Sequence, residues 1–133
     1  VGGFLLRRVG SEFVERNHNS QGSRDTRRIL QQASVGHSLV FFPEGTFRAE
    51  PGLGPFRQGA FNAARRGQVP LVPAVILGSR AMFPAHARLP RPGRLEVQIQ
   101  PPVETRHGAS SAELAAQCRA IMLPALGEPD LEE

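Results

Sequence analysis

The sequence predicts an α/β domain in which a partly parallel sheet is flanked by helices. Continuous apolar runs at 38–42 and 71–77 are typical of strands buried on both faces, and helix-like segments alternate with them. The chain has 133 residues, of which 40% are hydrophobic, enough for one core but not for two. Ligands in such sheets bind beyond the carboxyl ends of strands, so we expect the chemistry at 15–16 and 43–46.

Two helices are predicted in the first half of the chain. Ser23 can cap a helix over 24–34, in which apolar side chains recur on one face. A glycine-rich loop at 45–59 leads into a second helix over 60–66, which Gly67 is expected to end.

A strand and a third helix are predicted in the second half. A proline-rich loop at 83–93 precedes a strand at 95–99, whose alternating pattern indicates one face in water. Ser110 and Glu113 then form a capping box at the start of a helix. Its apolar stripe consists of Leu114, Ala115, Cys118, Ile121 and Met122, and its expected end is at Pro124 and Gly127.

Charge is distributed unevenly along the chain. There is no Lys, so all 16 strongly basic residues are Arg, and four of the 12 acidic residues lie in the last six positions. We therefore divide the chain into a domain at 1–127 and an acidic tail at 128–133. The basic body suits a phosphate-bearing partner and suits an ordinary solvated surface equally well. Nucleic acid is disfavoured as a partner, because Arg is spread along the chain and no Tyr or Trp offers a stacking platform.

The single cysteine, Cys118, excludes an internal disulfide and a cysteine zinc site. It lies on the apolar face of a predicted helix, so we expect a buried, inert thiol. We expect no metal and no cofactor. The longest apolar stretch, 69–77, is broken by Pro70 and Pro73, which predicts no transmembrane segment in this chain.

The segment 42–46 (Phe-Pro-Glu-Gly-Thr) combines features of a binding site. Its proline ends the apolar run, and Glu44 places a carboxylate at the tip. Gly45 allows a ligand to approach the backbone closely, and Thr46 adds a hydroxyl and an amide. By itself the segment fits either a site for a polar head group or a turn with a surface glutamate.

With its neighbours, this segment resembles the 1-acylglycerol-3-phosphate acyltransferase (lysophosphatidate acyltransferase) family. The similarity extends from 10 to 102, and the segments that carry it, in the order of the family, stand at 10–16, 42–46, 52–61 and 69–73. The resemblance implies a glycerol-phosphate acyltransferase-like fold whose N-terminal portion is missing from this chain.

The resemblance also implies a set of substrate-binding residues, namely Arg16, Glu44, Gly45, Thr46 and Arg48. Arg16 would grip the phosphate of the acyl acceptor, because a guanidinium binds phosphate through two hydrogen bonds. Glu44 would orient Arg16 or accept a hydrogen bond from the acceptor's hydroxyl. Many family members carry Arg directly after the threonine, where Phe47 stands here, and we expect Arg48 to reach the phosphate instead.

The family's catalytic base is a His-x4-Asp pair, in which the histidine takes the proton of the acceptor hydroxyl and the aspartate supports the imidazolium. No such pair occurs in this chain. His18 and Asp25 come nearest, but six residues separate them. We therefore assign no catalytic residue here and expect the pair upstream.

The function that the resemblance implies is transfer of a fatty acyl group to a hydroxyl of a lysophospholipid of the 1-acylglycerol-3-phosphate type. The donor would be acyl-CoA or acyl-carrier protein, as a co-substrate. The protein would work at the cytoplasmic face of a membrane, as a peripheral protein, and the isolated chain would be inactive. The alternative is a non-catalytic phospholipid- or phosphate-binding domain that has lost its base.

Overall fold

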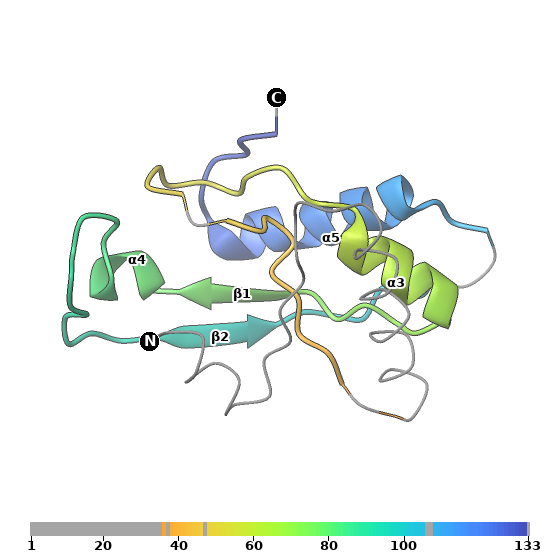
Figure 1. Ribbon diagram of the computed structural model, residues 1–133, viewed down its shortest axis with the longest axis horizontal. Coiled ribbons are helices and arrows are strands. Elements are labelled where there is room, and N and C mark those ends of the chain that lie inside the picture. Colours follow the sequence, from red (N-terminus) through yellow and green to blue (C-terminus); the bar gives the residue numbers. More distant parts are fainter. Residues whose placement is uncertain (1–35, 37, 47, 106–107, 133) are drawn as a thin grey trace, which may run out of the picture. The chain divides into compact units, whose positions relative to one another are not determined.

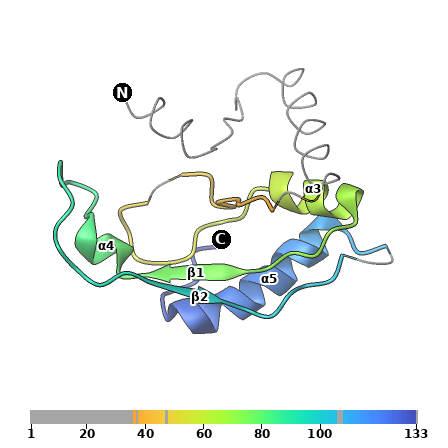
Figure 2. The ribbon, with the colours of Figure 1, turned by 90° about the horizontal axis from the view of Figure 1, so that it is seen from below.

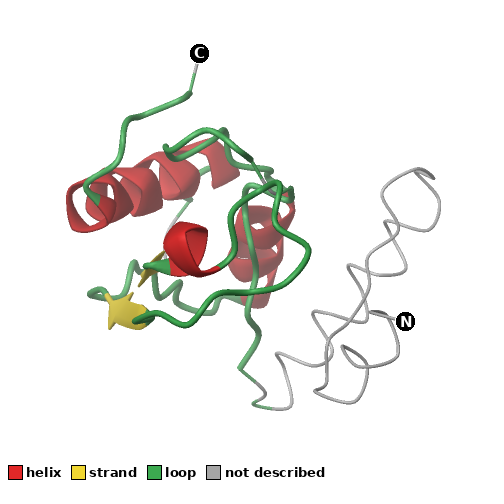
Figure 3. Ribbon diagram, turned by 90° about the vertical axis from the view of Figure 1, so that its left-hand side faces the viewer, coloured by secondary structure: helices red, strands yellow, loops and turns green. Residues whose placement is uncertain are grey.

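The computed structural model describes residue 36 and residues 38–46, 48–105 and 108–132. The helix predicted at 24–34 therefore lies outside the described residues. Figure 1 shows two adjacent strands and three helices within the described part of the chain. In chain order the elements are α3 (Gly59–Gly67), β1 (Ala74–Leu77), α4 (Ser79–Met82), β2 (Glu96–Ile99) and α5 (Ser111–Leu126). Loops make up much of the remainder (Figure 3).

The two described strands run antiparallel, so they do not show the parallel part of the predicted sheet. Ala74 pairs with Ile99, and Leu77 pairs with Glu96. The connection between the strands, made of α4 and the proline-rich loop, stays at the end of β1 where it begins (Figure 1). Since the chain never crosses to the other end of the pair, β2 must return in the opposite direction. Parallel pairing occurs in the described residues only as an isolated bridge between Leu53 and Asp130.

The strand predicted at 38–42 is wrong. No element forms there, and the side chains of Val40 and Phe42 are 84% and 73% exposed. A strand needs a neighbour to accept and donate its backbone hydrogen bonds, and within the described residues none lies beside this run. Apolar composition alone does not supply that neighbour.

The strand predicted at 71–77 forms over only Ala74–Leu77, and only Val75 of these four residues is buried. Leu71 instead makes an isolated bridge, donating to the carbonyl of Val103 at 2.9 Å and accepting from its N–H at 2.7 Å. Pro73 lies between the two pairings and has no N–H to donate, so the ladder is interrupted there.

The helix α5 confirms the predicted capping box and apolar stripe. Glu113 N–H donates to Ser110 Oγ at 3.2 Å, and Ser110 N–H donates to Glu113 Oε2 at 2.6 Å. The expected end at Gly127 is confirmed, since this glycine caps the helix with φ +67°, but Pro124 does not end the helix, which continues through it to Leu126. A proline in the last turn removes one hydrogen bond only, which the helix tolerates near its end. The buried cluster against α5 comprises Leu53, Phe56, Phe61, Val103, Leu114, Ala115 and Cys118.

The predicted helix over 60–66 is confirmed as α3, which extends one residue further at each end. The predicted terminator, Gly67, is its last helical residue, and Gln68 adopts the left-handed conformation with φ +51° instead. The Gln68 and Val69 N–H groups bond back to Arg65 and Ala64 carbonyls, at 3.4 and 3.2 Å. The chain therefore leaves α3 in a closed turn toward β1.

The alternation at 95–99 predicts a strand with one face in water, which is confirmed, but the exposed face of β2 is the apolar one. Val97 and Ile99 are 57% and 74% exposed, whereas Glu96 and Gln98 are half-buried. The helix α5 packs against β1 (Figure 2), and Val75 is the buried residue of that strand. Val97 pairs with Ile76, and both point to the opposite face, which is open.

The acidic segment 128–132 folds back onto the glycine-rich loop. Leu53 N–H donates to the Pro129 carbonyl at 2.9 Å, and Leu131 N–H donates to the Leu53 carbonyl at 3.0 Å. The Leu131 side chain lies directly on Gly52, where an added Cβ would stand 2.5 Å from Leu131 Cγ. The segment is thus packed against residues 52–54.

Replacing Leu114 by Ala should lower the free energy of unfolding by about 2–5 kcal/mol, because this fully buried side chain leaves a cavity in the core. Leu89→Ala is the matched control, since Leu89 is 78% exposed and its loss should cost under about 0.5 kcal/mol. Urea denaturation of both variants measures the difference. Equal losses would contradict the placement of the core against α5.

Replacing Val97 by Thr should raise the concentration at which the protein aggregates, because it reduces an exposed apolar face. The unfolding free energy should change by less than about 1 kcal/mol. Val75→Thr, on the buried side of the same sheet, is the control and should destabilise by about 1–3 kcal/mol through its buried hydroxyl. Light scattering and thermal unfolding provide the readouts, and the same response from both variants would show that the two faces are not distinct.

Candidate functional site

The segment 42–46 forms a tight turn. Gly45 N–H donates to the Phe42 carbonyl at 3.0 Å, which closes four residues around Pro43. Proline suits the second position of such a turn, and Gly45 has φ +66°, a conformation that costs other residues energy. The turn places Glu44 at its third position, so the carboxylate projects from a constrained backbone.

Arg57 packs on the same turn. Its N–H donates to the Pro43 carbonyl at 2.8 Å, and a Cβ added to Gly45 would stand 2.5 Å from Arg57 Nε. The side chain of Arg57 is exposed. No role was assigned to Arg57 from the sequence, although it lies in the segment 52–61 that contributes to the family resemblance. The structure thus adds a cation beside the glycine of the turn.

The side chains of Glu44 and Arg48 both lie against Gly54. Gly54 N–H donates to Glu44 Oε2 at 2.8 Å, and Gly54 itself is buried. A Cβ added to Gly54 would lie 2.9 Å from Glu44 Oε2 and 2.8 Å from Arg48 Nε. The absence of a side chain at this position is therefore what lets a carboxylate and a guanidinium lie on the same backbone.

The other predicted site residues divide into two groups. Gly45 and Thr46 lie in the turn beside Glu44, and the Thr46 side chain is exposed. Arg16 lies outside the described residues, so its expected position next to Glu44 stays a prediction.

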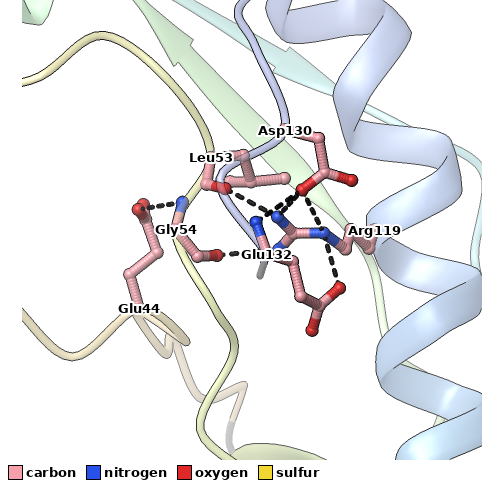
Figure 4. A network of polar contacts seen from close by, with 6 residues as sticks. All are labelled: Glu44, Leu53, Gly54, Arg119, Asp130 and Glu132. Carbon is pink, nitrogen blue, oxygen red and sulfur yellow. Dashed lines mark hydrogen bonds and ion pairs between the residues drawn. The ribbon is translucent and has the colours of Figure 1, made fainter.

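The loop that carries Gly54 is held from behind by Arg119 of α5 (Figure 4). Arg119 Nη1 donates to the Gly54 carbonyl at 2.7 Å, and Nη2 donates to the Leu53 carbonyl at 2.6 Å. The guanidinium also lies over the Phe56 ring, with Cζ 5.1 Å from the ring centroid. Arg119 is only 5% exposed, so its charge is buried within this set of contacts.

Two carboxylates of the C-terminal segment neutralise Arg119. Asp130 accepts hydrogen bonds from Arg119 Nε at 3.0 Å and from Nη2, and Glu132 forms an ion pair with Nε at 2.8 Å. The hydrogen bonds from Arg119, and then the one from Glu132 N–H, hold the pKa of Asp130 below its ordinary value. Asp130 therefore stays ionised at neutral pH, and the ion pair is lost only as the pH falls into the acid range.

Arg119 could have been suspected from the sequence by spacing alone. It follows the predicted core position Ala115 by four residues, so it lies on the same face of the helix. What the sequence did not reveal is the partner, because Asp130 lies beyond the helix end and the accepting carbonyls lie more than sixty residues earlier.

Cys118 is buried and unpaired, as expected from its position on α5. Burial raises the pKa of its thiol above the ordinary value, because desolvation disfavours the thiolate. Within the described ranges, no group of three or more His, Cys, Asp or Glu is arranged to hold a metal ion. The same part of the chain contains no helix long and apolar enough to span a membrane.

The arrangement suits a ligand that carries both a hydroxyl and an anionic group. Glu44 offers a carboxylate on a rigid turn, and Arg48 and Arg57 place guanidinium groups on the two glycines that flank it. Guanidinium groups bind phosphate oxygens strongly, and a carboxylate accepts hydrogen bonds from hydroxyls.

Comparisons with known proteins identify the family to which the chain belongs. A family model described as Acyltransferase matches residues 1–77. The 1-acyl-sn-glycerol-3-phosphate acyltransferase of Salmonella typhimurium is 31% identical over 127 residues, which are 93% of this chain and 51% of that protein. The alpha form of the same enzyme from Mus musculus is 38% identical over 99 residues, which are 73% of this chain and 35% of that protein.

A solved structure extends the comparison to the fold. The crystal structure of the 1-acyl-sn-glycerophosphate acyltransferase PlsC from Thermotoga maritima matches with a TM-score of 0.77 and 21% identity, covering 95% of this chain and 50% of that one. The α/β acyltransferase-like fold is thereby confirmed, whereas the described strands, which are antiparallel, do not show the parallel part predicted for the sheet. The chain spans about half or less of the length of these relatives. By its family match and its relatives, the chain belongs to the acyltransferase family that includes the 1-acyl-sn-glycerol-3-phosphate acyltransferases.

Proposed function

We propose that the protein containing this chain transfers a fatty acyl group from a thioester, acyl-CoA or acyl-carrier protein, to a hydroxyl of a lysophospholipid of the 1-acylglycerol-3-phosphate type. The observation that carries the proposal is that the side chains of Glu44 and Arg48 both lie against Gly54, in a member of the acyltransferase family. This chain supplies the part of the site that binds the acceptor. The protein acts as a peripheral protein at the cytoplasmic face of a membrane.

The acceptor's phosphate is bound by Arg16 and Arg48, and Thr46 adds a hydroxyl and an N–H at the exposed side of the turn. Arg57 supports this proposal as a third cation beside Gly45. The carboxylate of Glu44 repels phosphate, so its role is to orient a guanidinium or to accept a hydrogen bond from the acceptor. Gly54 N–H fixes its direction at 2.8 Å.

The reaction is a direct attack of the acceptor oxygen on the thioester carbonyl. An oxygen–carbon bond forms, the carbon–sulfur bond breaks, and the hydroxyl proton passes to a base. That base is the histidine of a His-x4-Asp pair, which this chain lacks. No enzyme nucleophile is needed, which agrees with the buried, protonated state of Cys118.

A second candidate is favoured by one observation, the lack of a His-x4-Asp pair in the sequence. If the parent protein also lacks the pair, the same surface binds phospholipid or phosphate without turnover.

The isolated chain should show no acyl transfer above background with lysophosphatidate and acyl-CoA, because the base is absent. A longer protein in which a His-x4-Asp segment precedes the chain should be active, and replacing that histidine by Ala should abolish the activity. Release of free CoA thiol measures the rate. Activity of the isolated chain would show that the catalytic base lies within this chain and not in an upstream His-x4-Asp pair. A longer protein that is inactive but still binds lysophosphatidate would favour the non-catalytic binding domain.

Replacing Gly54 by Ala in the active protein should raise the KM for lysophosphatidate roughly 10-fold, because the new methyl group displaces two flexible charged side chains, Glu44 and Arg48. Those side-chain ends move easily, so the thermal unfolding midpoint should change little. Gly59→Ala is the matched control, since a Cβ at Gly59 meets no atom within 4 Å. An unchanged KM in Gly54→Ala would remove Glu44 and Arg48 from the acceptor site.

A further inference from the structure

A second arginine, Arg80 of α4, also donates hydrogen bonds to carbonyls of the glycine-rich loop at 45–59. Its Nη1 donates to the Arg48 carbonyl at 2.7 Å, and its Nη2 donates to the Gly52 carbonyl at 3.2 Å. Its Nε faces the carboxylate of Glu128, with both oxygens at 3.3 Å. Three nitrogens of one planar group thus reach three residues, two in the glycine-rich loop and one in the C-terminal segment.

Glu128 binds the same loop as Arg80 does. Its Oε2 accepts from Gly52 N–H at 2.7 Å, so the same carboxylate binds both the loop and the guanidinium. The side chains of Arg80 and Glu128 are 32% and 27% exposed, so water screens the pair less than it would a surface pair.

Arg80 and Arg119 form one clamp, which we define as these two guanidinium groups together with the segment 128–132. Arg119 binds the carbonyls of Leu53 and Gly54, and Arg80 binds those of Gly52 and Arg48. Both arginines also bind acidic residues of the segment 128–132. Every residue of the loop 52–54 is therefore held through its carbonyl oxygen.

The clamp is connected to the candidate site through Gly54 and Arg48. Gly54, whose carbonyl Arg119 holds, donates its N–H to Glu44. Arg48, whose carbonyl Arg80 holds, lies with its side chain over the same glycine. Arg48 is thus held through its own carbonyl, and Glu44 is held through a hydrogen bond from Gly54, whose carbonyl is itself bound by Arg119.

We propose that Arg80 and Arg119 are positioning residues, which use the acidic segment 128–132 to hold Glu44 and Arg48 in the orientation that binds the acyl acceptor. This inference rests on the proposed function for the identity of the ligand. It assigns the C-terminal acidic residues a role in positioning the site. In this proposal the clamp acts on the acceptor site alone, so its loss should leave the thioester donor's binding unchanged.

Lysine substitution separates charge from geometry. Arg80→Lys keeps the positive charge beside Glu128, but one ammonium group cannot reach the carbonyls of Arg48 and Gly52 at once. Arg119→Lys makes the same change in the buried half of the clamp. Arg94→Lys is the matched control, because Arg94 is also paired with a carboxylate, Glu96 at 3.5 Å, but its side chain is 89% exposed.

The experiment uses the longest natural protein that contains this chain and measures four quantities for each variant. In Arg80→Lys the backbone amides of Gly52 and Gly54 should exchange with deuterium roughly 10-fold faster or more, and the KM for lysophosphatidate should rise roughly 10-fold. The KM for acyl-CoA should stay unchanged, and the thermal midpoint should fall by less than about 5 °C. Arg94→Lys should match the wild type in all four. If the Arg119→Lys variant folds, it should show the same changes as Arg80→Lys. If Arg119→Lys does not fold, the result for Arg80→Lys alone tests the proposal.

Faster exchange with an unchanged acceptor KM would overturn the proposal, because the clamp would then stabilise the loop without orienting the site. Parallel changes in both KM values that follow the loss of folded protein would also overturn it. A wild-type protein that transfers no acyl group would refute the proposed function instead. Binding of lysophosphatidate, measured by calorimetry, would then replace KM, and equal affinities of wild type and Arg80→Lys would still refute the clamp's role.

Discussion

The burial of one guanidinium group organises the described part of this chain. Arg119 is 5% exposed on a helix whose other buried residues are apolar. A buried charge without partners costs several kcal/mol, so the fold must bring acceptors to it. It does so from two directions, with the carbonyls of Leu53 and Gly54 on one side and Asp130 on the other. The glycine-rich loop and the C-terminal segment thus meet at Arg119.

From this constraint the geometry of the candidate site follows. Arg119 also holds the carbonyl of Leu53, and because the peptide bond between Leu53 and Gly54 is trans, the N–H of Gly54 points the opposite way, toward Glu44 in the turn at 42–46. Glu44 accepts that hydrogen bond, and the missing side chain at Gly54 leaves room for Arg48. The site is therefore built on backbone groups that a buried guanidinium group, paired with half-exposed carboxylates, keeps in place.

The sequence predicted well those features that depend on neighbours within a few residues. The capping box of Ser110 and Glu113, the apolar stripe of α5 and the helix α3 are all local patterns, and each is present. The same holds for the turn at Phe42–Gly45, whose proline and glycine occupy the positions that such turns require.

Features that depend on distant neighbours were predicted poorly. The run at 38–42 is as apolar as a buried strand, yet its side chains are exposed, since burial depends on what covers a segment and not on its composition. The alternation in β2 was recognised, but which of its faces meets α5 was not. Within the site, Glu44 and Arg48 came from a contiguous motif, whereas Arg80 and Arg119 bind carbonyls 28 to 66 residues away. No local pattern encodes such contacts.

The proposed acceptor site requires that the side chain of Arg16 lie next to that of Glu44. A structure of the longest natural protein containing this chain, with lysophosphatidate bound, tests this requirement. We predict that the guanidinium of Arg16 and the side chain of Arg48 both lie within hydrogen-bonding distance of the phosphate, with the carboxylate of Glu44 in the same pocket and still bonded to Gly54 N–H. A phosphate bound elsewhere, or Arg16 and Glu44 pointing to opposite faces of the sheet, would contradict the proposed acceptor site.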